Sequence, residues 1–189
     1  MDQADVLSLF RRHGALLEGH FRLTSGLHSP GYLQSALVLQ HPPDAEALGR
    51  ALAAGLRTLG ATSVLSPALG GLIIGHEVAR ALGVRALFAE RQDGAMTLRR
   101  GFSLTPADRV VVIEDVVTTG GSTRETMAVA EATGATVVGA GSIIDRSGGH
   151  STLEVPFRSL VALTLPTYDP AACPMCQSGQ PVVKPGSRN

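Results

Sequence analysis

The chain has 189 residues, of which 44% are hydrophobic, and its formal net charge at pH 7 is zero. This length and apolar content suit one folded domain, and the balanced charge argues against a broad basic surface for nucleic acid. The first residues include acids, and no run approaches the roughly 18 apolar residues of a membrane span. We therefore expect a cytoplasmic protein that binds neither nucleic acid nor membrane.

Helical and strand patterns alternate along most of the chain. Apolar residues near one face predict a helix over 3–18, and turn residues between short β-type runs predict a hairpin or hood over about 18–40. Asp44 is the expected cap of the next helix, which Gly60 ends. Further strands and helices are expected at 63–68, 70–83, 84–90, 109–115, 120–134, 135–146 and 157–165.

Two segments lack a clear period. Residues 91–108 are polar and rich in Gly and Arg, and such a long connection is typical of a lid or binding loop, here placed at about 91–105. The tail over about 166–189 is Pro-rich and irregular. The rest predicts an α/β domain spanning 1–189, with a mostly parallel central sheet flanked by helices, because its inner strands are continuous apolar runs.

The most informative stretch is "VVVIEDVVTTGGST", which ends at Thr123. Ligands of a parallel sheet bind beyond the carboxyl ends of its strands, where Glu114 and Asp115 are expected. The small-residue turn 118–122 then leads into a helix, whose N-terminus attracts phosphate. Carboxylates suit ribose hydroxyls or a hydrated Mg²⁺, so the stretch predicts a ribose-phosphate site. The plainer alternative is a strand–turn–helix with incidental acids.

The same stretch resembles the phosphoribosyl-pyrophosphate motif of the type I phosphoribosyltransferases. Within that family the chain is most similar to the members that use orotate. "GHFRLTSGLHSPGYLQ" is similar to their hood, "SIIDRSGG" to their Asp-Arg strand end, and "KPGSR" to the tail of some members. The likeness covers essentially the whole chain and implies the type I phosphoribosyltransferase fold with a small N-terminal hood.

The resemblance implies a glycosyltransferase of de novo pyrimidine (UMP) biosynthesis. Its reaction joins orotate to the ribose of 5-phosphoribosyl 1-pyrophosphate, which releases pyrophosphate and gives orotidine 5′-monophosphate. It also implies Mg²⁺ as cofactor and a homodimer in which the lid reaches the partner's site. The residues implied for the donor are Glu114, Asp115, Val116, Val117, Thr118, Thr119, Gly120, Gly121 and Ser122, together with Arg91, Arg99 and Arg100 from the lid.

The resemblance also assigns roles within that site. Asp115, Glu114 and Arg91 are the implied catalytic residues, with the lid arginines neutralising pyrophosphate. Thr118 and Arg146 are implied to contact orotate, whose carboxylate suits an Arg fork. A structural pairing of Arg146 with Asp145 is the alternative.

Three positions depart from the family pattern. The family lid contains lysines and a histidine, whereas this lid has neither, so which arginine acts is open. Thr24 stands where many relatives have Lys. In "SPALGG" either Gly70 or Gly71 stands where a Lys is common, although backbone N–H groups of such a loop can bind pyrophosphate.

The two cysteines, Cys173 and Cys176, form one C-x-x-C in the tail. A structural zinc site needs four ligands, and only two are local, so zinc would require histidines or a second subunit. The six histidines show no metal spacing. We therefore expect a surface thiol pair and assign no protein-bound metal ligands.

Two competing functions are open at this stage. One is a phosphoribosyltransferase for adenine, hypoxanthine, xanthine or uracil, with the same donor site. The other is a non-catalytic regulator that senses phosphoribosyl pyrophosphate and binds nucleic acid. Such a regulator needs a DNA-binding domain or basic face, for which this chain has neither the length nor the charge.

Overall fold

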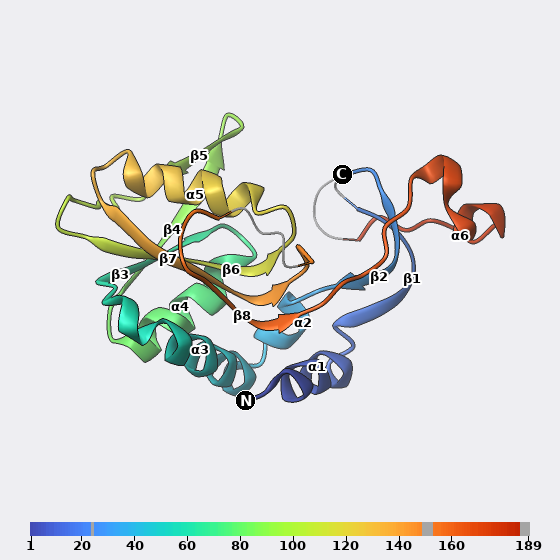
Figure 1. The fold of residues 1–189 in the computed structure, drawn as a ribbon, viewed down its shortest axis with the longest axis horizontal. Coiled ribbons are helices and arrows are strands. Elements are labelled where there is room, and N and C mark those ends of the chain that lie inside the picture. Colours follow the sequence, from blue (N-terminus) through green and yellow to red (C-terminus); the bar gives the residue numbers. More distant parts are fainter. Residues whose placement is uncertain (24, 149–152, 186–189) are drawn as a thin grey trace.

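A six-stranded sheet forms the centre of the computed structural model, which describes residues 1–23, 25–148 and 153–185 (Figure 1). The strand order is β5-β4-β3-β6-β7-β8, and all neighbours run parallel except β5, which is antiparallel to β4. The strands are β3 Ser63–Pro67, β4 Arg85–Gln92, β5 Ala95–Leu98, β6 Arg109–Val117, β7 Thr136–Asp145 and β8 Phe157–Ala162.

Helices cover both faces of this sheet (Figure 1). Helices α3 (Pro42–Leu56) and α4 (Gly71–Leu82) pack on one face, and α5 (Gly121–Glu131) packs on the other. The inner strands are apolar on both sides, so Val111 and Ile113 of β6 face one core, while Val110 and Val112 face the other. This alternation confirms the expected α/β fold with a mostly parallel sheet.

The N-terminal segment adds α1 (Gln3–Arg12), the hairpin of β1 (Leu16–Arg22) and β2 (His28–Leu33), and the short helix α2 (Ala36–Leu39). The hairpin stands beside the sheet as the expected hood, and the C-terminal tail runs along it (Figure 1). The tail contains two short helical turns, η2 (Pro170–Ala172) and α6 (Pro174–Gln177), and η1 (Arg57–Leu59) extends α3.

Two local expectations were wrong near the N-terminus. The first helix ends at Arg12 rather than at residue 18, because Gly14 has a φ of 60° and Leu16 begins β1. Asp44 does not cap α3, whose N-cap is His41 without a side-chain bond. The Asp44 carboxylate instead lies 2.7 Å from His13 Nε2, which ties α3 to the end of α1.

The segment expected to be an irregular lid is a hairpin. Strand β4 continues to Gln92 and turns back into β5 through Asp93 and Gly94, whose φ values are 50° and 87°. Strand β6 likewise continues past Glu114 and Asp115 to Val117. No helix in the described part of the chain is long and apolar enough to cross a membrane.

Candidate active site

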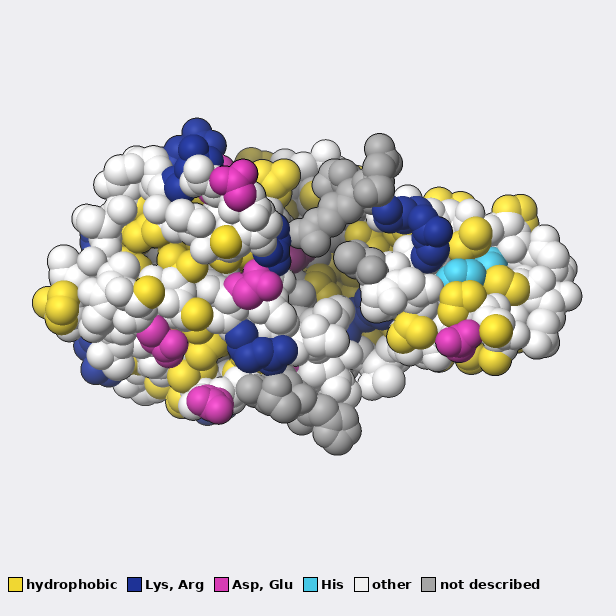
Figure 2. Space-filling view, turned by 90° about the horizontal axis from the view of Figure 1, so that it is seen from above, with side chains coloured by type: hydrophobic (Ala, Val, Ile, Leu, Met, Phe, Trp, Pro, Cys, Tyr) yellow, Lys and Arg dark blue, Asp and Glu magenta, His cyan; other side chains and the backbone are white. Residues whose placement is uncertain are grey.

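The candidate site lies where the carboxyl ends of parallel strands meet. Val117, the last residue of β6, is paired with Asp145, the last residue of β7, and the backbone N–H of Arg146 donates to Val117 O at 2.7 Å. Strand β3 ends alongside at Pro67. The acid-pair strand, the Asp-Arg strand end and the loop after β3 are therefore neighbours, as expected for a parallel sheet. Seen from above, the molecule is hollowed between the sheet and the hood (Figure 2).

The two acids sit at this edge with different exposures. Glu114 is 7% exposed, and Asp115 is half-buried. Burial raises the pKa of Glu114 well above its usual value, and the neighbouring charge of Asp115 raises it further. The Glu114 carboxyl also hydrogen-bonds with the carboxyl of Asp115 and with the Ser122 hydroxyl. The two carboxyl groups therefore lie together at a place where a diol or a cation would satisfy both.

The loop after β3 passes directly over Asp115. A Cβ atom added to Gly70 would lie 2.6 Å from Asp115 Oδ1, and one added to Gly71 would lie 2.8 Å from Ile113 O. A side chain at Gly70 would therefore have to displace the Asp115 carboxylate, and one at Gly71 would meet the backbone of β6. The peptide between Ala68 and Leu69 is cis, and the Leu69 side chain is 75% exposed at the tip of the loop.

The turn after β6 supplies an uncapped helix N-terminus. Gly120 is the N-cap of α5 with a φ of 74°, which favours glycine, and it makes no side-chain cap bond. No acid lies in the first turn of α5, while Thr118, Thr119 and Ser122 are exposed. The backbone N–H groups of this turn are therefore oriented for an anion, together with nearby hydroxyls.

Arg146 is placed beside the acids by the end of β7. Its Nε is buried and has no hydrogen-bond partner, and no ion pair to Asp145 occurs among the described residues. The Asp145 carboxylate instead accepts a bond from Ser147 N at 2.7 Å. Burial lowers the pKa of Arg146 below its ordinary value, although the guanidinium stays charged. The geometry thus favours a ligand role over the structural pairing.

Tyr32 is a site residue that the sequence did not single out. It lies in β2 of the hood, where burial raises the pKa of its hydroxyl. The charge of Asp115 raises this pKa further, while that of Arg146 lowers it, so the Tyr32 hydroxyl lies within electrostatic reach of both groups. From the sequence, only the hood segment could be assigned to this residue, because Asp115 and Arg146 lie far from Tyr32 along the chain.

Each of the three lid arginines forms an ion pair with a glutamate of α5 or β4. Arg91 donates to Glu125 of α5 at 2.5 Å and to Gly94 O at 2.6 Å. Arg100 binds Glu90 through two bonds, of 2.8 and 3.0 Å, and Arg99 lies 3.6 Å from the same carboxylate. Arg91 is thus linked to α5, the helix that follows the turn 118–122, whereas Arg99 and Arg100 are linked to β4.

Two earlier expectations have other outcomes. Thr24, one of the three departures from the family pattern, lies outside the described residues. The surface thiol pair was wrong for Cys173, which is fully buried, whereas Cys176 is exposed.

No family model matches the chain. Individual curated proteins and solved structures that are similar to it nevertheless point to one family. The orotate phosphoribosyltransferase of Pelotomaculum thermopropionicum is 54% identical over 188 residues, which cover 100% of this chain and 99% of that protein. That of Heliobacterium modesticaldum is 53% identical over 190 residues, with both chains fully covered. The crystal structure of the Aeropyrum pernix enzyme superposes with a TM-score of 0.70 at 25% identity, over 84% of this chain and 93% of that one. The chain therefore belongs to the orotate phosphoribosyltransferase family.

Proposed function

We propose that this chain transfers the phosphoribosyl group of 5-phosphoribosyl 1-pyrophosphate to orotate, in de novo pyrimidine biosynthesis, through the site at the ends of β6 and β7. The observation that carries the proposal is the acid pair of β6, which leads into an uncapped helix N-terminus beside the unpartnered Nε of Arg146. Family membership supports the same substrates.

The donor site follows from the chemistry of these groups. The turn 118–122 suits the 5′-phosphate, because its N–H groups and the end of α5 favour an anion. Glu114 and Asp115 suit the ribose hydroxyls, since carboxylates accept O–H bonds. The loop over Asp115 brings backbone N–H groups to the side where pyrophosphate leaves, and Gly70 and Gly71 keep that approach open.

The acceptor site is formed by the strand end and the hood. Arg146 provides a positive fork for the orotate carboxylate, and Thr118 stands at the start of the turn beside it. Tyr32 covers this side from the hood. Transfer to the base nitrogen proceeds through an oxocarbenium-like transition state, so the site contributes positioning and charge stabilisation rather than a nucleophile.

Magnesium fits the carboxylate pair. Mg²⁺ is bound by one or two carboxylates together with substrate phosphates and retained waters. Asp115, with Glu114 behind it, offers this set next to the turn 118–122, and a cation would offset the repulsion between the two neighbouring carboxyl groups. When bound, the ion would supply positive charge against the pyrophosphate and ribose oxygens.

We further propose a cytoplasmic homodimer in which the β4–β5 hairpin closes over the pyrophosphate. The hairpin carries Arg91, while Arg99 and Arg100 follow directly after β5, and the family resemblance assigns this segment to the lid. Arg91 is the best placed for catalysis, because it contacts α5.

The test is a substrate panel. The purified chain is incubated with Mg²⁺, phosphoribosyl pyrophosphate and, separately, orotate, uracil, adenine, hypoxanthine or xanthine, and nucleotides are separated by chromatography. We expect orotidine 5′-monophosphate from orotate and no product from the other bases. Product from another base alone would contradict the acceptor assignment, and no product from any base would contradict the transferase function.

A further inference from the structure

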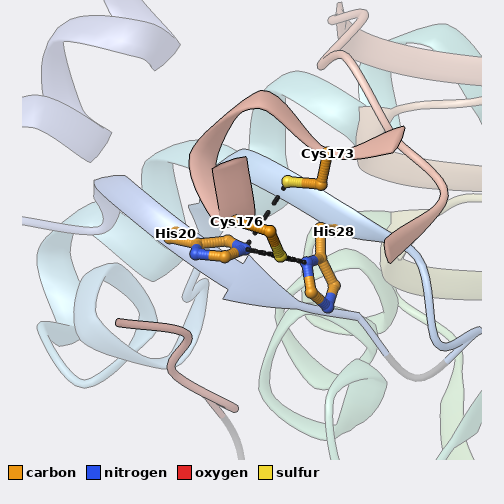
Figure 3. Close-up of side chains that lie close together, drawn as sticks. All are labelled: His20, His28, Cys173 and Cys176. Carbon is orange, nitrogen blue, oxygen red and sulfur yellow. Dashed lines mark hydrogen bonds between the residues drawn. The ribbon is translucent and has the colours of Figure 1, made fainter. Parts of the chain in front are cut away.

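We propose that His20, His28, Cys173 and Cys176 form a structural zinc site that fastens the C-terminal tail to the hood. Figure 3 shows the four side chains converging from the β1–β2 hairpin and from the turn around α6. Their four ligand atoms all lie within 4.8 Å of one another. None of these residues belongs to the donor or acceptor site described above.

The spacing of the ligand atoms matches a tetrahedral zinc ion. Zn–N bonds of about 2.0 Å and Zn–S bonds of about 2.3 Å imply edges of roughly 3.3 Å between nitrogens and 3.5 Å between nitrogen and sulfur. The Cys173 sulfur lies 3.6 Å from His20 Nε2, and the Cys176 sulfur lies 3.7 Å from the same atom and 3.3 Å from His28 Nδ1. His20 Nε2 and His28 Nδ1 are 2.8 Å apart, so a small outward shift would admit the ion.

The β1–β2 hairpin brings the two histidines together. His28 pairs with Arg22, which is two residues after His20 in β1. His20 itself lies at the register shift between Glu18 and Phe21, and its Nε2 lies 2.8 Å from His28 Nδ1, so the two histidines meet diagonally across the hairpin. Eight positions separate them in sequence, which is wider than the H-x₃₋₅-H spacing of zinc fingers.

Backbone pairing brings the cysteines to these histidines. Tyr168 exchanges two hydrogen bonds with His28, of 2.8 and 2.9 Å, just before the C-x-x-C turn. After that turn, Val183 N donates to His20 O at 2.8 Å, and Arg22 N donates to Val183 O at 2.9 Å. The tail is therefore anchored to the hairpin on both sides of Cys173 and Cys176.

The surroundings of the cluster suit a neutral, closed site. His20 Nδ1 lies 2.8 Å from the Gln180 carbonyl, so this nitrogen carries the proton and Nε2 presents its lone pair to the other ligands. His20, His28 and Cys173 are each less than 9% exposed. Binding Zn²⁺ displaces the two thiol protons, and two thiolates balance the charge of the ion. Two sulfurs and two nitrogens in tetrahedral array favour zinc over hard, oxygen-binding cations.

The first experiment measures metal in the full chain, expressed without a histidine tag in zinc-supplemented medium and purified under reducing conditions without chelator. We expect about one zinc per chain by elemental analysis. Zinc-free protein titrated with Co²⁺ should give the intense visible bands of tetrahedral cobalt and a thiolate charge-transfer band. Protein without zinc, whose cobalt titration gives neither band, would overturn the proposal, and this measurement needs no variant.

The second experiment uses variants. His28→Ala and Cys176→Ser should lose the bound zinc and the cobalt bands, while His76→Ala should keep both, because His76 is an exposed histidine of α4. In the zinc-bound chain, a chelator should accelerate proteolysis within residues 166–185. Zinc retained in both ligand variants, or a tail whose cleavage ignores the chelator, would contradict the structural site.

Discussion

Gly70 lies against the carboxylate of Asp115, so closely that a Cβ on Gly70 would stand 2.6 Å from Asp115 Oδ1. The loop after β3 and the acid pair of β6 are therefore packed as one unit, although 45 positions separate them in the sequence. Because Gly70 has no side chain, its backbone can approach the Asp115 carboxylate this closely, and any larger residue there would have to displace that carboxylate.

Replacing Gly70 with alanine should push the loop and Asp115 apart. The expected result is a fall in kcat/KM for phosphoribosyl pyrophosphate on the order of 10- to 100-fold, since small displacements of positioned groups have costs of this size. Steady-state kinetics with the donor varied would measure it. Gly55→Ala is the matched control, because a Cβ there meets only ordinary contacts at 3.8 Å or more. Equal kinetics for the two variants would contradict the packing argument.

Glu114→Gln should change the pH dependence of stability. The folded-state pKa of Glu114 is raised, so its contribution is fully present below the unfolded-state pKa and is lost as pH rises towards the folded one. The Gln variant lacks this loss, so its free energy of unfolding should decline less than that of the wild type above the usual Glu range. Denaturant unfolding at several pH values measures the difference. A variant that parallels the wild type throughout would show that Glu114 is not buried as described.

The sequence predicted the central sheet and the strand–turn–helix that carries the acid pair, because both signals are local. The apolar runs of β3 and β6 identify buried strands without reference to the rest of the chain, and the residues proposed for the donor lie between positions 114 and 122. The β4–β5 hairpin could also have been predicted, because Asp93-Gly94 is a strong hairpin signal. The polar residues on either side of this pair weakened the strand pattern.

Other features depend on contacts between distant segments. Leu16 continued a helical pattern and became a strand only because it pairs with Leu33. Tyr32 lies near the site because the fold brings its strand close to Asp115 and Arg146. The sequence around Tyr32 contains no sign of this proximity. The cluster of His20, His28, Cys173 and Cys176 brings Cys173 next to His20, which is 153 positions earlier in the sequence. Its two histidines are placed by the pairing of the hairpin rather than by a recognised metal spacing.

Asp115→Asn should weaken use of the donor, because one carboxylate contact with the ribose hydroxyls becomes an amide contact. A hydrogen bond to a charged group contributes roughly 1.5–3 kcal/mol, which corresponds to a ~10- to 100-fold loss in kcat/KM for phosphoribosyl pyrophosphate. Asp2→Asn, at the exposed N-cap of α1 where asparagine caps as well as aspartate, is the matched control for the same chemical change. Normal donor kinetics in Asp115→Asn would exclude the ribose assignment.

Arg146→Ala should raise KM for orotate more than KM for the donor. The guanidinium has a buried Nε without a partner and no ion pair among the described side chains, so its removal breaks no structural bridge there. Loss of a charge-assisted bond to the orotate carboxylate implies a ~10- to 100-fold effect. Arg158→Ala, from an exposed position on β8, should leave both constants unchanged. Steady-state assays with each substrate varied in turn separate the two constants. Equal increases for both substrates would argue against a carboxylate contact and place Arg146 on the donor side, whereas restoration of orotate binding by Arg146→Lys would show that charge rather than the planar fork is what the acceptor site requires.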